Sequence, residues 1–205
     1  MINNLYDKFS FDEEIIEYHN SRFIRKKIKI PENYKKINIE IGFGNGEFLI
    51  KNAISKPDEL FIGIEVYVNG IATVLTKIST CDIKNIILSN LNSFYLLDAI
   101  PSNSIDKIMI INPDPWKKKR HHKRRLMSYK IIKLLRRVIK SKHSIYMTTD
   151  SESYLKDTED LLRENKDCFG SFTQNTLTDK DELYGISRYQ RKAIEKGGKI
   201  YLLVF

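Results

Sequence analysis

The sequence predicts an α/β fold, a doubly wound and mostly parallel sheet of about seven strands with helices on both faces. Three observations predict it. Short apolar runs rich in Ile and Val recur along the chain, segments with helical spacing separate them, and the first run ends in a turn with closely spaced glycines. Apolarity that is continuous rather than alternating is typical of strands that are covered on both faces.

The predicted strands are short, about six or seven residues each for the four clearest ones. These four span residues 37–43, 60–66, 107–112 and 144–150. A weaker run at 86–91 predicts a fifth strand, and the run at 199–205 predicts another. The polar stretch 165–186 is expected to hold one strand and a loop.

Segments with helical spacing follow the strands. They span residues 46–55, 68–79, 124–140 and 151–165. The clearest is 124–140, where one apolar face is formed by Met127, Ile131, Leu134, Leu135 and Val138. The last segment begins after Asp150 or Ser151, either of which suits an N-cap, and Glu152 adds an acid to its first turn. Strands and helices in alternation predict βαβ units and therefore parallel neighbours.

Net charge is concentrated in one segment of this chain of 205 residues, the basic strip at 117–125. The strip carries seven Lys and Arg side chains and no acid, and without them the formal charge of +9 would fall to +2. A uniformly basic, histone-like protein is therefore excluded. A strip this dense usually faces a polyanion, and a solvated basic face is the alternative.

The other totals set the class of protein. Apolar residues make up 41% of the chain, enough to bury a core, and the length suits one domain. We expect an N-terminal extension at 1–30 and the domain at 31–205. Two cysteines exclude a disulfide framework and fit a reducing compartment. No apolar run approaches the ~18 residues that span a bilayer, and residues 1–20 are polar rather than signal-like. A cytoplasmic protein without a membrane partner is expected.

The first predicted strand ends in a turn that combines three glycines with an acid. Gly42, Gly44 and Gly46 follow Glu40 in the order Gly-x-Gly-x-Gly. Glycines at this spacing let the backbone approach a ligand without Cβ clashes, and an ordinary strand-to-helix turn is the alternative. A dinucleotide fingerprint would need a third glycine at Glu47, where a carboxylate would instead repel a pyrophosphate.

The second predicted strand also ends in an acid, Glu65. A carboxylate at this place accepts ribose hydroxyls in dinucleotide-binding folds, and a solvated charge is the alternative. With Glu40, the glycine turn resembles the first motif of Rossmann-like S-adenosylmethionine-dependent methyltransferases. Their cofactor has no phosphate, and its ammonium group can meet a carboxylate.

The predicted strand at 107–112 runs into Asn112-Pro113-Asp114-Pro115-Trp116 and then into the basic strip. The two prolines stiffen this peptide and hold the Asp114 carboxylate at the mouth of the sheet. Trp116 can stack on a base or pack in the turn, and packing is the commoner role. His121 and His122 are adjacent, so they point apart, and no partner ligands stand at useful spacing. No metal is expected.

The string from 113 to 125 resembles the signature of the tRNA (guanine-N7)-methyltransferase family, which is Pro-Asp-Pro-Trp, Lys, then Arg-His-x-Lys-Arg-Arg. The resemblance extends over residues 37–205 and includes Gly63-Ile64-Glu65-Val66, Thr148-Thr149-Asp150 and Ile200-Tyr201. It implies a Rossmann-like class I methyltransferase. The implied reaction moves a methyl group from S-adenosylmethionine to N7 of a tRNA guanine, at variable-loop position forty-six, and forms N7-methylguanosine.

The resemblance also assigns roles to single residues. Cofactor contacts are implied for Glu40, Gly42, Gly44, Gly46, Glu65, Asn92 and Asp114. Asp114 is in addition the implied catalytic residue. Contacts to the substrate nucleotide are implied for Lys118, Asp150, Ser187, Arg188, Tyr189 and Gln190. Contacts to RNA phosphates are expected from Lys119, Arg120, Lys123, Arg124 and Arg125. The partner is tRNA, and the protein is expected to be a monomer or a homodimer.

The chain departs from the family pattern at several of these positions. Gln190 replaces a Glu, Asn112 an apolar residue, Asn92 a common acid, and Ala193 a common aromatic, while Ser187 keeps the hydroxyl of a Thr. Two other functions therefore stay open. One is a non-catalytic or weakly active RNA-binding protein on the same fold. The other is a nicotinamide-dependent oxidoreductase, against which the acid in place of the third glycine argues.

The implied reaction does not require the protein to remove a proton from the nucleophile. Guanine N7 carries a lone pair and no proton at neutral pH, so its attack on a methyl group needs no general base. We expect catalysis to come from alignment of the reacting atoms. The hypothesis for Asp114 is that its carboxylate accepts from guanine N1–H and the exocyclic amine and stabilises the growing positive charge on the base.

Overall fold

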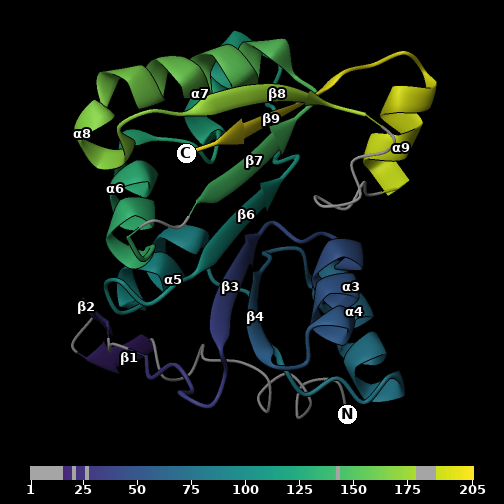
Figure 1. Cartoon of the computed structure of the whole chain (residues 1–205). Coiled ribbons are helices and arrows are strands. Elements are labelled where there is room, and N and C mark those ends of the chain that lie inside the picture. Colours follow the sequence, from purple (N-terminus) through teal and green to yellow (C-terminus); the bar gives the residue numbers. More distant parts are fainter. Residues whose placement is uncertain (1–15, 20–21, 26–27, 142–143, 179–187) are drawn as a thin grey trace.

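The computed structural model describes residues 16–19, 22–25, 28–141, 144–178 and 188–205. Its centre is a sheet of seven strands in the order β5-β4-β3-β6-β7-β9-β8, which confirms the predicted α/β fold (Figure 1). The strands are β3 Lys36–Ile41, β4 Glu59–Ile64, β5 Ile86–Ser89, β6 Lys107–Ile111, β7 Ile145–Thr149, β8 Thr173–Leu177 and β9 Ile200–Val204. β3 to β7 pair in parallel, and β9 pairs antiparallel with both β7 and β8.

The chain reverses its direction of progress across the sheet between β3 and β6. It first moves outward from β3 through β4 to β5, and then returns to place β6 on the other side of β3. In open α/β sheets, a ligand binds outside the carboxyl ends of the strands at such a switch point. The expected ligand site therefore lies where β3 and β6 end.

The predicted helical segments are all found as helices, and their bounds agree except at the segment 124–140. They are α3 Glu47–Ser55, α4 Val68–Thr80, α5 Ser93–Ala99, α6 Tyr129–Val138, α7 Glu152–Glu164, α8 Lys166–Phe169 and α9 Arg188–Glu195. The predicted start at 124 is wrong because Ser128 caps α6, with its hydroxyl accepting from the Ile131 N–H. Residues Lys119–Arg124 form a separate 3-10 helix, η1. α5, α8 and α9 had no counterpart among the predicted elements.

Alternation along the strands divides the core between the two faces of the sheet. Ile37, Ile39 and Ile41 of β3 are buried with α5, α6 and α7 on one face. Phe61 of β4 is buried with α3 and α4 on the other face. Figure 1 shows these two groups of helices on opposite sides of the sheet. Helices on both faces explain why the strands read as continuous apolar runs.

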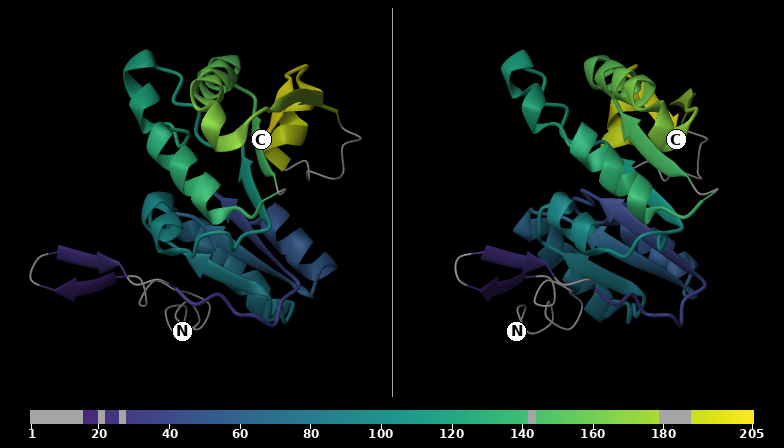
Figure 2. Two further views of the ribbon diagram at one scale, coloured as in Figure 1. Left: turned by 60° about the vertical axis from the view of Figure 1, so that its left-hand side comes forward. Right: turned by 90° about the vertical axis from the view of Figure 1, so that its left-hand side faces the viewer.

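The chain ahead of the sheet contains a small hairpin, and not a helix, within the described part. β1 (Ile16–His19) and β2 (Arg22–Arg25) pair antiparallel, and the hairpin projects from the main body (Figure 2). β2 contacts α5, and the Ile28 N–H donates to the Ala99 carbonyl at 3.3 Å. Among the described helices, none has the length and apolar character that a membrane span requires.

Candidate functional site

The glycine turn after β3 needs its glycines for two separate reasons. Gly42, Gly44 and Gly46 have φ values of 74°, 55° and 71°, a region that side chains disfavour. At Gly46 an added Cβ would also come within 2.2 Å of the Val74 Cγ2 on α4. The turn therefore packs tightly against α4. It lies at the carboxyl end of the sheet because it directly follows β3.

Glu40 carries a buried carboxyl group beneath this turn. The residue is 2% exposed, and its Oε2 has no hydrogen-bond partner among the described residues. Burial, and then the neighbouring charge of Glu65, raise the pKa of Glu40 to about 8. A buried carboxylate of this kind is costly unless a cation or a donor meets it. The site therefore fits a ligand that brings positive charge.

Glu65 braces the glycine turn from the end of β4. Its Oε2 accepts from the Gly44 N–H at 2.8 Å, and its Oε1 accepts from the Tyr67 N–H at 2.9 Å. A carboxylate has about four lone-pair sites, so each oxygen can accept a second bond from a ligand. Val66, Tyr67 and Val68 follow with 64%, 58% and 68% of their surface exposed, which gives apolar surface beside an acceptor pair.

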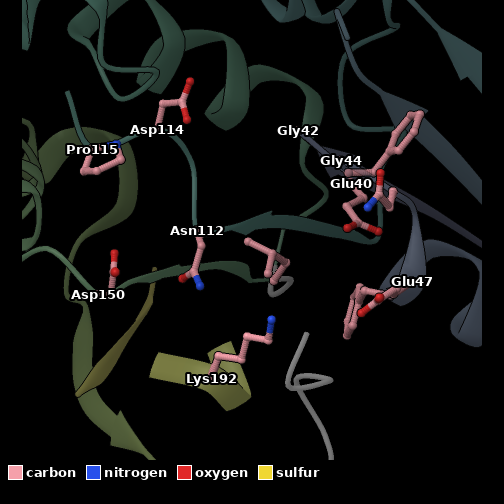
Figure 3. Close-up of a pocket in the computed structure, with 13 residues that line it drawn as sticks. Glu40, Gly42, Gly44, Glu47, Asn112, Asp114, Pro115, Asp150 and Lys192 are labelled. Atoms are coloured by element: carbon pink, nitrogen blue, oxygen red, sulfur yellow. The ribbon is translucent and has the colours of Figure 1, made fainter. Parts of the chain in front are cut away.

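A pocket of about 690 Å³ opens at the switch point between β3 and β6 (Figure 3). Its size suits a cofactor or a nucleotide. It is lined by Glu40, Gly42, Phe43, Gly44, Asn45, Glu47, Phe48, Ile111, Asn112, Asp114, Pro115, Asp150 and Lys192. The structure thus brings Glu40, Gly42, Gly44, Asp114 and Asp150 to one cavity, whereas Gly46 and Glu65 are not among the residues that line it.

Lys192 is a pocket residue that the sequence analysis missed. It extends from α9 into the same cavity as Asp150 and Asn112 (Figure 3). The signal available in the sequence was its place two residues after the predicted site residue Gln190. That place gave no hint that α9 packs across the end of β7, because this packing depends on the tertiary fold.

Asn112 and Gln190 meet at the hydroxyl of Thr148 on β7. Thr148 Oγ1 accepts from the Asn112 N–H at 3.2 Å and from Gln190 Nε2 at 3.1 Å, and it donates to Asn112 Oδ1 at 3.0 Å. Thr148 and Gln190 are 0% and 1% exposed. Two positions that depart from the family pattern are therefore joined through one buried hydroxyl.

The peptide 113–116 is held between two residues in the left-handed region. Asn112 and Trp116 have φ values of 45° and 44°. The Arg124 guanidinium lies 4.9 Å from the centroid of the Trp116 ring, and His121 meets that ring edge-on at 5.8 Å. Trp116 therefore packs against the basic strip. Asp114 stays exposed at the mouth of the pocket.

Arg125 does not belong to the exposed part of the basic strip, so its prediction as an RNA phosphate contact is wrong. Its side chain is 3% exposed. Nε donates to the Pro115 carbonyl at 2.8 Å, and Nη1 donates to Asp157 at 2.6 Å. Both Nη atoms also bind Ser153, at 3.0 Å and 2.9 Å. A guanidinium with these partners fixes the peptide 113–116 onto α7, and four of its five N–H groups are already used within the protein. The other cations of the strip are exposed: Lys117, Lys118, Lys119, Arg120, Lys123 and Arg124.

Several predicted site residues lie outside the pocket lining. Asn92 caps α5, with its Oδ1 accepting from the Phe94 N–H at 2.9 Å, and it is exposed beyond β5. Lys118 precedes η1 on the exposed strip. Ser187 is outside the described residues, and Arg188 and Tyr189 are described only as the backbone that begins α9. Their roles remain predictions.

Comparisons with known proteins place the chain in a family. A family model described as "Putative methyltransferase" matches residues 34–203. A tRNA (guanine-N(7)-)-methyltransferase of Wolbachia pipientis is 33% identical over 92% of this chain and 83% of its own length. The chain belongs to the tRNA (guanine-N7)-methyltransferase family.

Other relatives show the limits of the match. A "Bifunctional methyltransferase" of Rickettsia felis is 34% identical over 89% of this chain, and the chain spans about a third of that protein's length, 34%. Among solved structures, the 16S rRNA methyltransferase KamB aligns with a TM-score of 0.63 and 10% identity, over 83% of this chain and 87% of its own. At that identity the likeness shows the fold alone, a Rossmann-like methyltransferase sheet.

Proposed function

We propose that this protein transfers a methyl group from S-adenosylmethionine to N7 of a guanine in tRNA, at variable-loop position forty-six, in the cytoplasm. The observation that carries the proposal is the buried Glu40, whose Oε2 has no hydrogen-bond partner among the described residues, in a pocket that is also lined by Asp114, three residues before the basic strip. The name of the Wolbachia relative supports the same reaction.

The residues around the glycine turn fit S-adenosylmethionine. When bound, this cofactor supplies an electrophilic methyl group on a sulfonium. Glu40 would meet its ammonium group, because a buried carboxylate without a partner is stabilised by a cation. Glu65 would accept from the ribose hydroxyls with its remaining lone pairs. The glycine turn gives the backbone close approach that this contact needs.

Asp114 would act on the guanine. Guanine N7 has a lone pair and no proton, so no residue has to serve as a general base. The Asp114 carboxylate would accept from N1–H and the exocyclic amine and would stabilise the positive charge that develops on the base. Asp150 and Lys192 line the same pocket and would position the nucleotide, with Asp150 the position that matches the family pattern.

The exposed cations of the basic strip would bind tRNA phosphates. Six Lys and Arg side chains of the strip are exposed, from Lys117 to Arg124, and they follow Asp114 directly in the chain. Lys and Arg that neutralise phosphates release condensed counterions, which makes such binding strong at low salt. The strip would thus hold the tRNA while Asp114 and Asp150 hold the reacting nucleotide.

Incubation of the protein with an unmodified tRNA transcript and methyl-labelled S-adenosylmethionine tests the proposal. Mass spectrometry of nuclease fragments should find N7-methylguanosine at variable-loop position forty-six, and Asp114→Asn should abolish most of it. A protein that binds tRNA and the cofactor but transfers no label would be a non-catalytic RNA-binding protein on this fold. Label at another guanine would correct the assigned position alone.

A further inference from the structure

The side-chain amide of Asn112 has a defined orientation because the Thr148 hydroxyl is fully used. A hydroxyl has one proton and two lone pairs. Thr148 Oγ1 accepts from Gln190 Nε2 at 3.1 Å and from the Asn112 N–H at 3.2 Å, an N–H that it shares with the Thr148 carbonyl at 3.1 Å. Its proton is then left for Asn112 Oδ1, at 3.0 Å. The Asn112 amide therefore directs its carbonyl oxygen to Thr148 and its Nδ2 away from it.

Asn112 Nδ2 is a buried donor without a partner at the pocket wall. The atom is shielded from solvent and has no hydrogen-bond partner among the described residues. Asn112 lines the pocket together with Asp114, Asp150 and Lys192, and in Figure 3 its amide lies between Asp150 and Glu40. A buried donor left unpaired costs about 1–3 kcal/mol, so it marks a place where a ligand acceptor fits.

The residue at position 190 decides which end of this amide faces the pocket. Gln190 can donate to Thr148, which sends the Thr148 proton to Asn112 Oδ1. A glutamate there would only accept, so Thr148 would donate to it and Asn112 would turn its Nδ2 toward Thr148. The pocket would then present an acceptor in place of a donor. Asn112 and Gln190 thus form one unit, although they lie far apart in the sequence.

We propose that Asn112 is a specificity-determining residue whose Nδ2 donates to O6 of the target guanine, and that Gln190 is the positioning residue that orients it through Thr148. This inference rests on the proposed function, since it takes guanine as the base. O6 lies between N7 and N1–H on the guanine ring. A donor at Asn112 and an acceptor at Asp114 match O6 and N1–H, whereas adenine presents an amine donor where guanine presents O6.

The first experiment removes the hydrogen bond from either side. It uses tRNA in which the target guanine is replaced by 6-thioguanine, which keeps N7, N1–H and the exocyclic amine but offers a much weaker acceptor. The enzyme variant is Asn112→Gly, because glycine keeps the positive φ of this position. We expect the wild type to have a roughly tenfold lower kcat/KM on the thio substrate than on the natural tRNA. The variant should already have a lower kcat/KM on the natural tRNA and should lose little more when the thio substrate replaces it.

The second experiment tests whether Gln190 acts through Asn112. Gln190→Glu should lower kcat/KM for the natural tRNA by roughly tenfold or more, because an acceptor would then face O6. In the Asn112→Gly background the same change should have little effect. Asn112→Asp keeps the side-chain shape and tests the point again, since it also places an acceptor in the pocket and should be at least as impaired as Asn112→Gly.

The outcomes separate this inference from the proposed function. The loss of kcat/KM caused by the thio substrate, or by Gln190→Glu, could be as large in the Asn112→Gly background as in the wild type. Either result would overturn the inference, while methyl transfer by the wild type would still support the proposed function. An equal loss of S-adenosylhomocysteine affinity in Asn112→Gly would also overturn it, since Nδ2 would then face the cofactor. A wild type that transfers no methyl group to guanine would overturn the proposed function and this inference with it.

Discussion

Glu40 and Glu65 stand at the ends of two paired parallel strands, and their carboxylates are in opposite situations. Glu40 pairs with Gly63, two residues before Glu65, in the register of β3 and β4. Glu65 accepts from two backbone N–H groups, whereas Glu40 Oε2 has no partner in the described part of the chain. Glu65 therefore stabilises the turn, and Glu40 stays available for a ligand.

The first prediction concerns the stability of the ligand-free protein. The pKa of Glu40 is raised from 4.5 to about 8 by burial and by the charge of Glu65. Between these two values the folded protein binds a proton that the unfolded chain has released, so stability falls as pH rises through this window. Glu40→Gln should remove that cost and raise the free energy of unfolding at pH 8 by on the order of 2–4 kcal/mol. Urea denaturation at pH 5 and at pH 8 measures it.

The matched control is Glu164→Gln, a change at the exposed end of α7. It should leave both unfolding curves nearly unchanged. An equal stability of wild type and Glu40→Gln at pH 8 would mean that the Glu40 carboxylate is already compensated in the ligand-free protein.

The second prediction concerns the pH dependence of ligand binding. Below about pH 8 most of the ligand-free protein carries a neutral Glu40, since its pKa is raised to about 8. An ammonium group favours the ionised carboxylate, so binding of S-adenosylhomocysteine should release a proton. Its affinity should rise by up to about tenfold per pH unit as pH approaches 8. Calorimetry in two buffers with different ionisation enthalpies counts the released proton, and Glu40→Gln should release none.

The third prediction separates chemistry from cofactor binding at Asp114. Asp114→Asn should lower the turnover of bound cofactor by about 10²–10³-fold, the usual cost of removing one preorganised stabilising group. Its affinity for S-adenosylhomocysteine should change little. Single-turnover kinetics and calorimetry measure the two effects. Asp160→Asn, a change at an exposed site on α7, serves as the control. A collapse of cofactor binding with normal turnover would assign Asp114 to the cofactor instead.

Local signals account for most of what the sequence predicted correctly. Glu40, Gly42 and Gly44 lie within a few residues of one another in the sequence, and all three line the pocket. The start of α6 also had a local signal, Ser128 ahead of the apolar residues, and the prediction missed it because the apolar periodicity extends further back. Elements of this kind follow from propensity and capping.

The remaining features depend on contacts between distant segments. Arg124 and Arg125 are neighbours of the same residue type, yet one lies over Trp116 and the other is buried against α7. Only the tertiary fold brings Ser153 and Asp157 to Arg125, from 28 and 32 residues away. The Gln190–Thr148 bond spans 42 residues. Sequence patterns record residue types, and they do not record which of two adjacent cations a distant helix will bind.

The fourth prediction concerns tRNA binding by the basic strip. Neutral replacement of four of its exposed cations should flatten the dependence of log K on log salt by about 3, at roughly 0.7–0.9 per phosphate neutralised. The four are Lys119, Arg120, Lys123 and Arg124. Titrations of labelled tRNA at several salt concentrations measure the slope. A control with four exposed lysines outside the strip replaced should keep it steep. Those lysines are Lys51, Lys77, Lys84 and Lys156. An unchanged slope in the first variant would place the RNA surface elsewhere.

The fifth prediction separates the two neighbouring arginines by their effect on folding. Arg125→Ala removes the donor of the Pro115 carbonyl, leaves Asp157 with the His122 contact, and removes a guanidinium that also lies 4.8 Å from the Tyr154 ring centroid. It should destabilise the protein by about 3 kcal/mol, the typical cost of breaking a buried hydrogen-bonded charge. Arg124→Ala removes one exposed contact to Trp116 and should cost about 1 kcal/mol or less. Urea denaturation of both variants compares them. Equal losses would show that the guanidinium of Arg125 is not what fixes the peptide 113–116 onto α7.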